Sequence, residues 1–249
     1  MQLISDIVQK TGEPGLLAVE AEKASRAYEI GRVSGLFSVP KVVGFGAEAG
    51  VLEFERLSDL VTLLDLAVHK NERLPELLKK AGQALAVVHE KLVLPGKMKK
   101  ELPPEWMDPT GENVFIHGDF ACINVCFHEP SDELVLLDWS AAPSVDRTPT
   151  FGSRYFDILM FVSSIFHGAP WRRALSWNAE EMAAIFLRGY GETVILHTLK
   201  AYASHICRLQ RKNIRELASQ RQPFRAAGYV CHHMRMNVRL SRFLHRYEI

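Results

Sequence analysis

The chain has 249 residues, of which 47% are hydrophobic and 24% charged, and its formal net charge at pH 7 is +1. These proportions are ordinary for a folded globular protein and exclude a disordered or fibrous chain. A net charge so close to zero gives no global field that favours nucleic acid as a partner. The length suits one large domain or two unequal lobes.

The N-terminal quarter of the chain predicts a small strand-rich unit with one helix. A strand is expected over residues 3–9, and a turn rich in Gly and Pro separates it from a helix expected over residues 17–30. Two more strands are expected over residues 41–45 and 51–54, joined by a turn that contains glycine at both ends. The pattern therefore predicts strand, helix, strand and strand in that order.

Helical spacing begins after Leu57. Ser58 and Asp59 are typical helix-capping residues, and apolar residues recur at helical spacing over residues 60–68. A second helix is predicted over residues 74–92, where the apolar residues form one stripe that faces a core. This part of the chain is thus expected to be helical.

Three short apolar runs follow a proline-rich connection. They occupy residues 114–116, 125–127 and 134–137, and polar turns bound each of them. Runs of this length predict strands rather than ordinary helices. Helices are expected over most of residues 155–247.

The sequence contains no apparent targeting or membrane segment. The N-terminus lacks a basic region followed by an apolar stretch, and no apolar run approaches the roughly 18 to 20 residues that span a bilayer. The four cysteines show no spacing typical of a disulfide scaffold. We therefore expect a cytoplasmic protein with no membrane span.

Three polar residues follow the short apolar runs. Asp119 and Asn124 stand five positions apart after the first run, and Asp138 follows the third run directly. Phosphoryl transfer requires a carboxylate that holds the attacking hydroxyl and oxygen ligands that fix Mg²⁺ against the phosphates. Each residue alone is more typical of a turn or a strand end. Together, in this spacing, they predict a phosphotransferase site.

The stretch from His117 to Asn124, with the sequence His-Gly-Asp at its start and Asp138-Trp139 downstream, resembles the aminoglycoside phosphotransferase and choline kinase-like families. These families share the protein-kinase fold. The resemblance implies that Asp119 is the catalytic base and that Asn124 and Asp138 bind Mg²⁺, with ATP as the phosphate donor.

The same resemblance implies an α+β, bilobal fold. A strand-rich N-lobe is expected over residues 1–57 and a mostly helical C-lobe over residues 58–249. It further implies that His117 supports the catalytic loop through hydrogen bonds. Asp157, at the start of a helix, is expected to brace that loop from below. The alternative for Asp157 is an early-helix carboxylate favoured by the helix dipole.

The nucleotide-binding residues implied by the resemblance lie in the first 57 residues. Lys10 and Glu22 resemble the Lys and Glu that pair over the nucleotide phosphates, with Glu20 taking the place of Glu22 if the helix register differs. Glu55 and Leu57 resemble the hinge whose backbone groups meet the adenine. The alternative is an edge strand that runs into a helix.

One departure from these families concerns the phosphate-covering loop. Kinase-like folds place two strands and this loop before the strand Lys, and the nine residues that precede Lys10 are too few to supply them. We therefore expect an N-lobe that lacks the first strands and the phosphate loop. A truncated chain, a minimal but active lobe, and a fold that has lost phosphotransfer are the three explanations.

The acceptor is expected to be a hydroxyl of a small molecule. Residues 208–246 contain ten Arg or Lys against one Glu, so we hypothesise a neutral or anionic acceptor rather than a cationic one. The alternative interpretation of this run is a set of helices with solvated basic faces. Two other functions stay open: a non-catalytic kinase-like module that binds a nucleotide or a protein, and a protein or lipopolysaccharide kinase.

Overall fold

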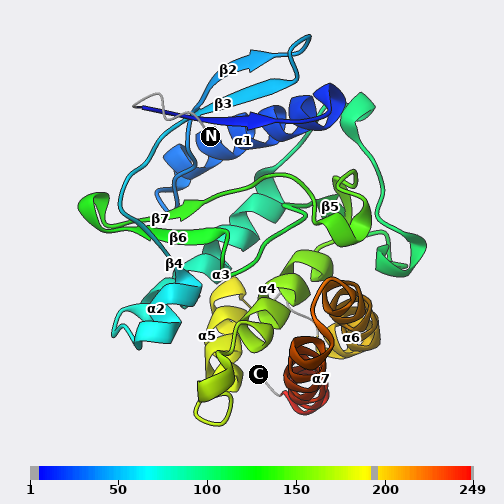
Figure 1. Cartoon of the computed structure of the whole chain (residues 1–249). Helices are drawn as coiled ribbons and strands as arrows, with labels where there is room; N and C mark the ends of the chain where they lie inside the picture. Colours follow the sequence, from blue (N-terminus) through cyan, green and yellow to red (C-terminus); the bar gives the residue numbers. More distant parts are fainter. Residues whose placement is uncertain (1–5, 192–195, 248–249) are drawn as a thin grey trace.

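The computed structural model describes residues 6–191 and 196–247 and has an α+β architecture. A small antiparallel sheet and one long helix occupy the top of Figure 1, and a larger helical part lies below them. A second small sheet lies between these two parts.

The upper sheet contains β1 (Ile7–Thr11), β2 (Val42–Gly46) and β3 (Val51–Glu55) in the order β1-β3-β2, all antiparallel. The strand expected over residues 3–9 begins and ends later, and residues 1–5 lie outside the described part of the chain. The expected absence of the first strands and the phosphate loop before β1 therefore stays a prediction.

Helix α1 (Pro14–Ser34) packs along this sheet, as Figure 1 shows. It begins where the Glu13 carboxylate accepts hydrogen bonds from two backbone N–H groups of the first turn. It ends at Gly35, whose φ of 66° is the left-handed conformation that favours glycine. Its buried face includes two charged residues, Glu20 and Lys23.

The middle sheet has the order β4-β6-β7 and contains β4 (Leu60–Thr62), β6 (Val125–His128) and β7 (Glu133–Leu136). The helix expected from residue 60 is therefore wrong in its first turn. Leu60 pairs with His128 across the sheet, and α2 (Leu63–His69) begins only after Thr62 caps it. Pairing with a strand 64 to 68 residues away overrides the local helical spacing, and sequence periodicity does not detect such a distant partner.

A two-stranded ribbon leads into the loop that carries Asp119. Strand β5 (Asn113–Phe115) pairs with β8 (Phe151–Ser153), and the sequence did not predict β8. The chain therefore leaves β5, forms the loop, and enters the middle sheet at β6.

The lower part is built from α3 (Leu74–Lys91), α4 (Tyr155–His167), α5 (Ala179–Tyr190), α6 (Leu196–Ser219) and α7 (Pro223–Arg246). Most residues of α4 are buried, so this helix forms the centre of the core. Helices α6 and α7 pack side by side in a hairpin at the lower right of Figure 1. No helix in the described ranges is long and apolar enough to cross a membrane.

Close packing of α3 against α5 depends on two glycines. A Cβ atom at Gly82 would stand 2.3 Å from the carbonyl oxygen of Phe186, and one at Gly189 would stand 2.2 Å from that of Lys79. The absence of a side chain at both positions lets the two helix backbones approach directly. This contact fixes α3 against α5.

Candidate active site

The three polar residues predicted after the short strands come together in the structure. The Nδ2 atom of Asn124 donates to the backbone oxygen of Asp119 at 2.9 Å and to its carboxylate at 3.2 Å. The backbone N–H of Leu137 donates to the carbonyl oxygen of Asn124 at 2.8 Å. Asp138 is the next residue, so one backbone hydrogen bond brings the end of β7 to the loop.

The carboxylate of Asp119 lies in a setting that disfavours its charge. Burial and the nearby charge of Asp138 together raise its pKa to about 6, against the opposing hydrogen bond from Asn124. A carboxylate with a pKa near the working pH is suited to accept a proton from a substrate hydroxyl.

Asp138 has a backbone conformation that is rare for its residue type. Its φ of 53° lies in the left-handed region, where non-glycine residues are found mostly at turns and functional sites. Its Oδ1 accepts hydrogen bonds from Ser140 Oγ at 2.6 Å and from Lys10 Nζ at 2.9 Å. Burial raises the pKa of Asp138, but these hydrogen bonds and the charge of Lys10 outweigh it and hold the pKa below its ordinary value.

Lys10 pairs with Glu20, and the expected pair with Glu22 is wrong. The distance from Lys10 Nζ to Glu20 Oε1 is 2.8 Å, whereas Glu22 pairs with Arg26 on the surface at 2.6 Å. Two residues along a helix turn the side chain by about 200°, so only one of these two glutamates faces β1. Glu20, the alternative in the sequence analysis, is that residue.

A cavity of about 390 Å³ lies between the upper and middle sheets, beside Lys10. Apolar side chains of β1, β3, β4 and β7 line most of it, and Lys10, Glu20 and Asp138 stand together at one end. Glu55 and Leu57, the expected hinge residues, also line the cavity. The cavity thus has an apolar part and a charged part, a division that suits a base and its phosphates.

Asp157 contacts the catalytic loop from α4. Its carboxylate accepts the backbone N–H of His117 at 2.7 Å and that of Gly118 at 2.8 Å, and it bonds to His89 Nε2 at 2.9 Å. Burial raises the pKa of this fully buried carboxyl, yet the hydrogen bonds and nearby charge of His89 outweigh it and hold the pKa below its ordinary value. His89 also contacts Tyr190 Oη at 2.8 Å, and the sequence analysis did not identify it.

His117 is buried against Trp139, with 4.4 Å between the ring centroids. Its Nδ1 accepts the backbone N–H of Asp119 at 3.3 Å. Burial lowers the pKa of His117 to about 4, so the ring is neutral at neutral pH and free to accept this bond.

Lys23 is a site residue that the sequence analysis missed. Its side chain is 1% exposed, and its Nζ donates to the carbonyl oxygen of His117 at the start of the catalytic loop. Burial lowers the pKa of Lys23 to about 8, against the charges of Asp157, Glu20 and others. The signal that indicates it is its position three residues after Glu20, on the same buried face of α1.

The donor set at Asp119, Asn124 and Asp138 fits Mg²⁺, which prefers oxygen ligands. Asn124 turns its Nδ2 toward Asp119, which leaves Oδ1 as a ligand atom. No group of three or more His, Cys, Asp and Glu side chains within the described residues is arranged to hold a metal. Two carboxylates with an amide suit Mg²⁺ nonetheless, because this ion commonly takes substrate phosphates and water as its other ligands.

No family model and no curated protein matches the chain. Solved structures do match it. A choline/ethanolamine kinase family protein from Mesorhizobium loti has a TM-score of 0.59 and 16% identity, with 97% of this chain and 86% of that chain covered. A glucosamine kinase has a TM-score of 0.59 and 15% identity, with coverage of 96% and 74%. The choline kinase LicA from Streptococcus pneumoniae has a TM-score of 0.51 and 14% identity, with coverage of 98% and 88%.

The chain has the protein-kinase-like fold of these small-molecule kinases. The expected α+β kinase-like fold with a helical C-lobe is confirmed. Strand β1 carries Lys10 and pairs with β3, which ends at Glu55, so Lys10 lies next to the expected hinge. The lobe boundary after Leu57 and the roles of the individual site residues stay predictions.

Proposed function

We propose that this chain is an ATP- and Mg²⁺-dependent phosphotransferase that moves the terminal phosphate onto a hydroxyl of a small molecule. One observation carries the proposal. Asn124 donates a hydrogen bond to the Asp119 carboxylate, Lys10 donates one to Asp138, and the backbone bond from Leu137 to Asn124 joins these two pairs beside a cavity that Lys10 and Asp138 line. Similarity in fold to choline and glucosamine kinases supports it.

The cavity between the two sheets binds the nucleotide in this proposal. The adenine lies among the apolar side chains, next to the backbone of Glu55 and Leu57. The phosphates extend toward Lys10, which Glu20 orients at 2.8 Å. Lys10 now contacts Asp138 and gains phosphate oxygens as partners once the nucleotide enters.

Asp119 acts on the acceptor. Its carboxylate accepts a hydrogen bond from the substrate hydroxyl and takes the proton as the hydroxyl oxygen bonds to the terminal phosphorus. The bond from that phosphorus to the bridging oxygen breaks, and ADP leaves. Asn124 fixes the direction of the Asp119 carboxylate throughout.

Asn124 and Asp138 hold Mg²⁺ in this proposal. The bound ion supplies positive charge that stabilises the negative charge on the transferring phosphate. The neutral ring of His117 and the carboxylate of Asp157 keep the loop in position and take no proton. Because ATP is the proposed donor, we expect the reaction in the cytoplasm.

Replacement of Asp119 by Ala tests the proposal. We expect turnover to fall by about 10³-fold or more, since both the base and the orientation of the hydroxyl are lost. Transfer of labelled phosphate from ATP to a panel of alcohols measures it, and Glu22→Gln on the surface is the matched control. An Asp119→Ala variant with full phosphotransfer contradicts the proposal.

A nucleotide titration separates this proposal from a module that does not bind nucleotide. ATP with Mg²⁺ at about 100 times its dissociation constant raises the unfolding free energy by about 2.7 kcal/mol. Thermal unfolding with ATP, with and without Mg²⁺, measures this. No shift under either condition favours the non-catalytic alternative.

A further inference from the structure

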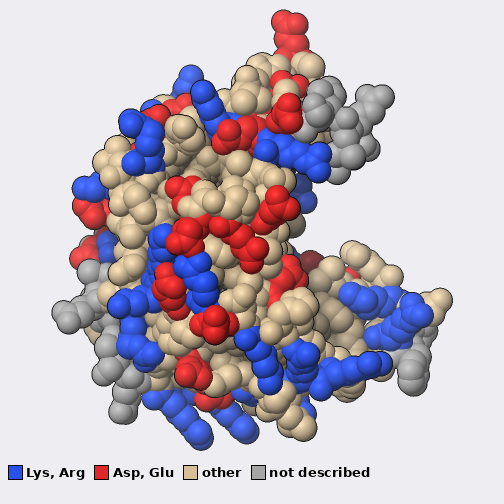
Figure 2. All heavy atoms as spheres, turned by 90° about the vertical axis from the view of Figure 1, so that its left-hand side faces the viewer, with Lys and Arg blue, Asp and Glu red and all other residues tan. Residues whose placement is uncertain are grey.

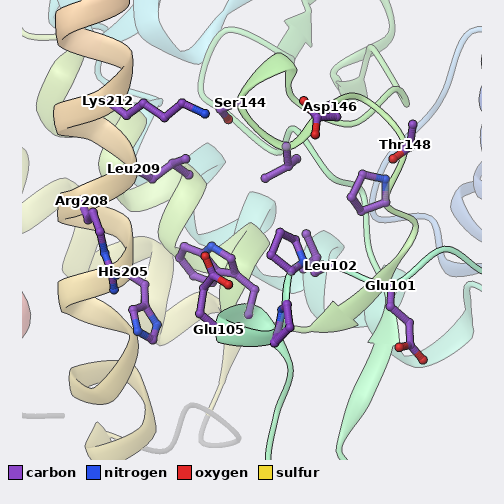
Figure 3. A pocket seen from close by; sticks show the side chains of 15 residues that line it. Glu101, Leu102, Glu105, Ser144, Asp146, Thr148, His205, Arg208, Leu209 and Lys212 are labelled. Atoms are coloured by element: carbon purple, nitrogen blue, oxygen red, sulfur yellow. The ribbon is translucent and has the colours of Figure 1, made fainter.

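A second cavity, of about 600 Å³, lies outside the nucleotide site. Three segments line it: residues 101–106, residues 144–149, and one face of α6 (Figure 3). The proposed function assigns it no role.

The wall formed by residues 144–149 is attached to the catalytic loop at both ends. Ala142 donates its backbone N–H to the oxygen of Gly118 at 3.0 Å, and Ile116 donates to the oxygen of Thr150 at 2.9 Å. Residues 116–118 directly precede Asp119. These two hydrogen bonds therefore connect one wall of the cavity to the residues that precede Asp119.

The floor and inner wall of the cavity combine an aromatic surface with buried polar atoms. The buried Trp106 ring stacks parallel on Tyr202 at 5.7 Å. Ser144 Oγ and His205 Nδ1 are both shielded from solvent without a hydrogen-bond partner among the described residues. Ring faces with nearby unused polar groups are typical of sites for polar ring compounds such as sugars.

Charge is divided between the two sides of the cavity. Arg208 and Lys212 stand one turn apart on α6, and Figure 3 shows both side chains extending from this helix beside the cavity. Among the described residues Arg208 forms no ion pair, and Lys212 has only an exposed contact of 3.9 Å with Glu216. Three carboxylates on the other two segments also line the cavity: Glu101, Glu105 and Asp146.

Figure 2 shows where Lys and Arg side chains gather on one face of the molecule. A hollow opens at its right-hand side, between the strand-rich part above and a projection below that carries many Lys and Arg side chains. The projection corresponds to the near ends of α6 and α7 in Figure 1. A cationic group that approaches Arg208 and Lys212 on α6 would meet like charge, whereas an anionic group would be attracted to them.

We infer that this cavity binds the acceptor and that Arg208 and Lys212 hold an anionic group on it, a carboxylate or a phosphate. The acceptor is thus a hydroxylated ring compound of the sugar-acid or sugar-phosphate type. Glu105 and Asp146 accept hydrogen bonds from its other hydroxyls. This inference rests on the proposed function, because it assigns the substrate class of that same site.

The test compares binding of matched ligands to the whole chain with ADP and Mg²⁺ present. Glucose, glucuronate, glucose 6-phosphate, glucosamine and choline vary the charge, and the first four of them keep one sugar ring. We expect the two anions to bind at least about tenfold more tightly than glucose, and choline to bind most weakly. The double variant Arg208→Met with Lys212→Met is expected to remove that difference while nucleotide affinity stays unchanged.

The control is a double variant with the same change in net charge. Arg225→Met with Arg242→Met removes two exposed cations of α7, one of which lines a separate basic cavity with Arg235 and Glu180. We expect anion affinity to be retained in this control. Loss of anion affinity in the control alone would move the site to α7 and overturn the inference.

Two sets of results separate this inference from the proposed function. Equal or tighter binding of choline or glucosamine, with phosphate transfer that still depends on Asp119, overturns the inference and leaves the function standing. Binding of the anions through Arg208 and Lys212 without any transfer from ATP overturns the function, and the cavity then stands as an anion site. An unchanged anion affinity in the Arg208/Lys212 variant overturns the inference directly.

Discussion

Two parts of the proposed active site are held in different ways: the loop from His117 to Asn124, and the Lys10 corner formed by Lys10, Glu20 and Asp138. In the loop, backbone N–H groups of His117 and Gly118 are fixed by Asp157, whose side chain is fully buried. At the corner, Lys10 and Asp138 are 35% and 43% exposed in their side chains. Buried charge-assisted hydrogen bonds fix geometry strongly, whereas half-exposed ion pairs contribute little.

This difference has a functional reason. In the proposed function the loop holds the group that acts on the hydroxyl, which must be in position before a ligand arrives. The Lys10 corner is proposed to contact the phosphates, so its partners have to exchange when the nucleotide binds. Variants that disturb the loop should therefore damage stability as well as activity, and variants of the corner should change nucleotide affinity first.

Replacement of Asp157 by Ala is expected to have the largest effect on stability. It leaves two buried N–H groups and His89 without their partner, so the unfolding free energy should fall by about 3–5 kcal/mol. Urea unfolding measures the loss. Asp157→Asn keeps one acceptor oxygen and should lose less; equal losses for the two variants would contradict the role of these hydrogen bonds.

Lys23→Met tests the buried cation between α1 and the loop. The pKa of Lys23 is about 8 in the folded chain, below its ordinary 10.5. Folding therefore releases a proton between these two pH values, and the wild-type unfolding free energy should rise with pH across that window relative to Lys23→Met. The rise is up to about 3 kcal/mol.

Denaturant unfolding from pH 8 to 10.5 measures this difference between the two proteins. The exposed Lys79→Met is the control and should run parallel to the wild type. A constant difference between wild type and Lys23→Met across the window would contradict a buried, charged Lys23. A loss of turnover in Lys23→Met is also expected, because the bond to His117 is removed.

Asp119→Asn should stabilise the fold while it stops turnover. The pKa of Asp119 is about 6 when folded, above its ordinary 3.8, so the ionised carboxylate destabilises the native state at neutral pH. In buffer without metal or nucleotide the variant should gain about 1–3 kcal/mol at pH 7. The gain should disappear as the pH falls from 6 toward 4, where the wild-type carboxyl takes up its proton. A gain that is constant with pH would contradict a raised pKa.

Glu20→Gln and Glu22→Gln give the smallest effects and test the helix register. Loss of the Glu20 charge leaves Lys10 less well oriented, so KM for ATP should rise by about three- to tenfold. Glu22→Gln removes only an exposed pair with Arg26. It should leave KM for ATP nearly unchanged and change the unfolding free energy by less than about 0.5 kcal/mol. Steady-state kinetics at varied ATP measures both. The reverse order of effects would reject the pairing of Lys10 with Glu20.

The sequence predicted the fold class through a resemblance that a short stretch of residues carries. The spacing of Asp119, Asn124 and Asp138, between short strands, is readable within 20 residues. It could not predict that β5 pairs with β8 or that Leu60 begins a strand, because those partners lie far along the chain. Pairings of this kind are determined by packing rather than by local propensity.

Only the tertiary structure showed that Glu20 rather than Glu22 pairs with Lys10. It also showed that Lys23 contacts His117. The sequence places all three residues on one helix, but only the packing of α1 against the sheet and the loop determines which face is buried. Charged residues are expected on the exposed face of a helix, so Lys23 was not predicted at the catalytic loop. The sequence by itself determined the chemical groups of the site, and the tertiary structure decided which of them face one another.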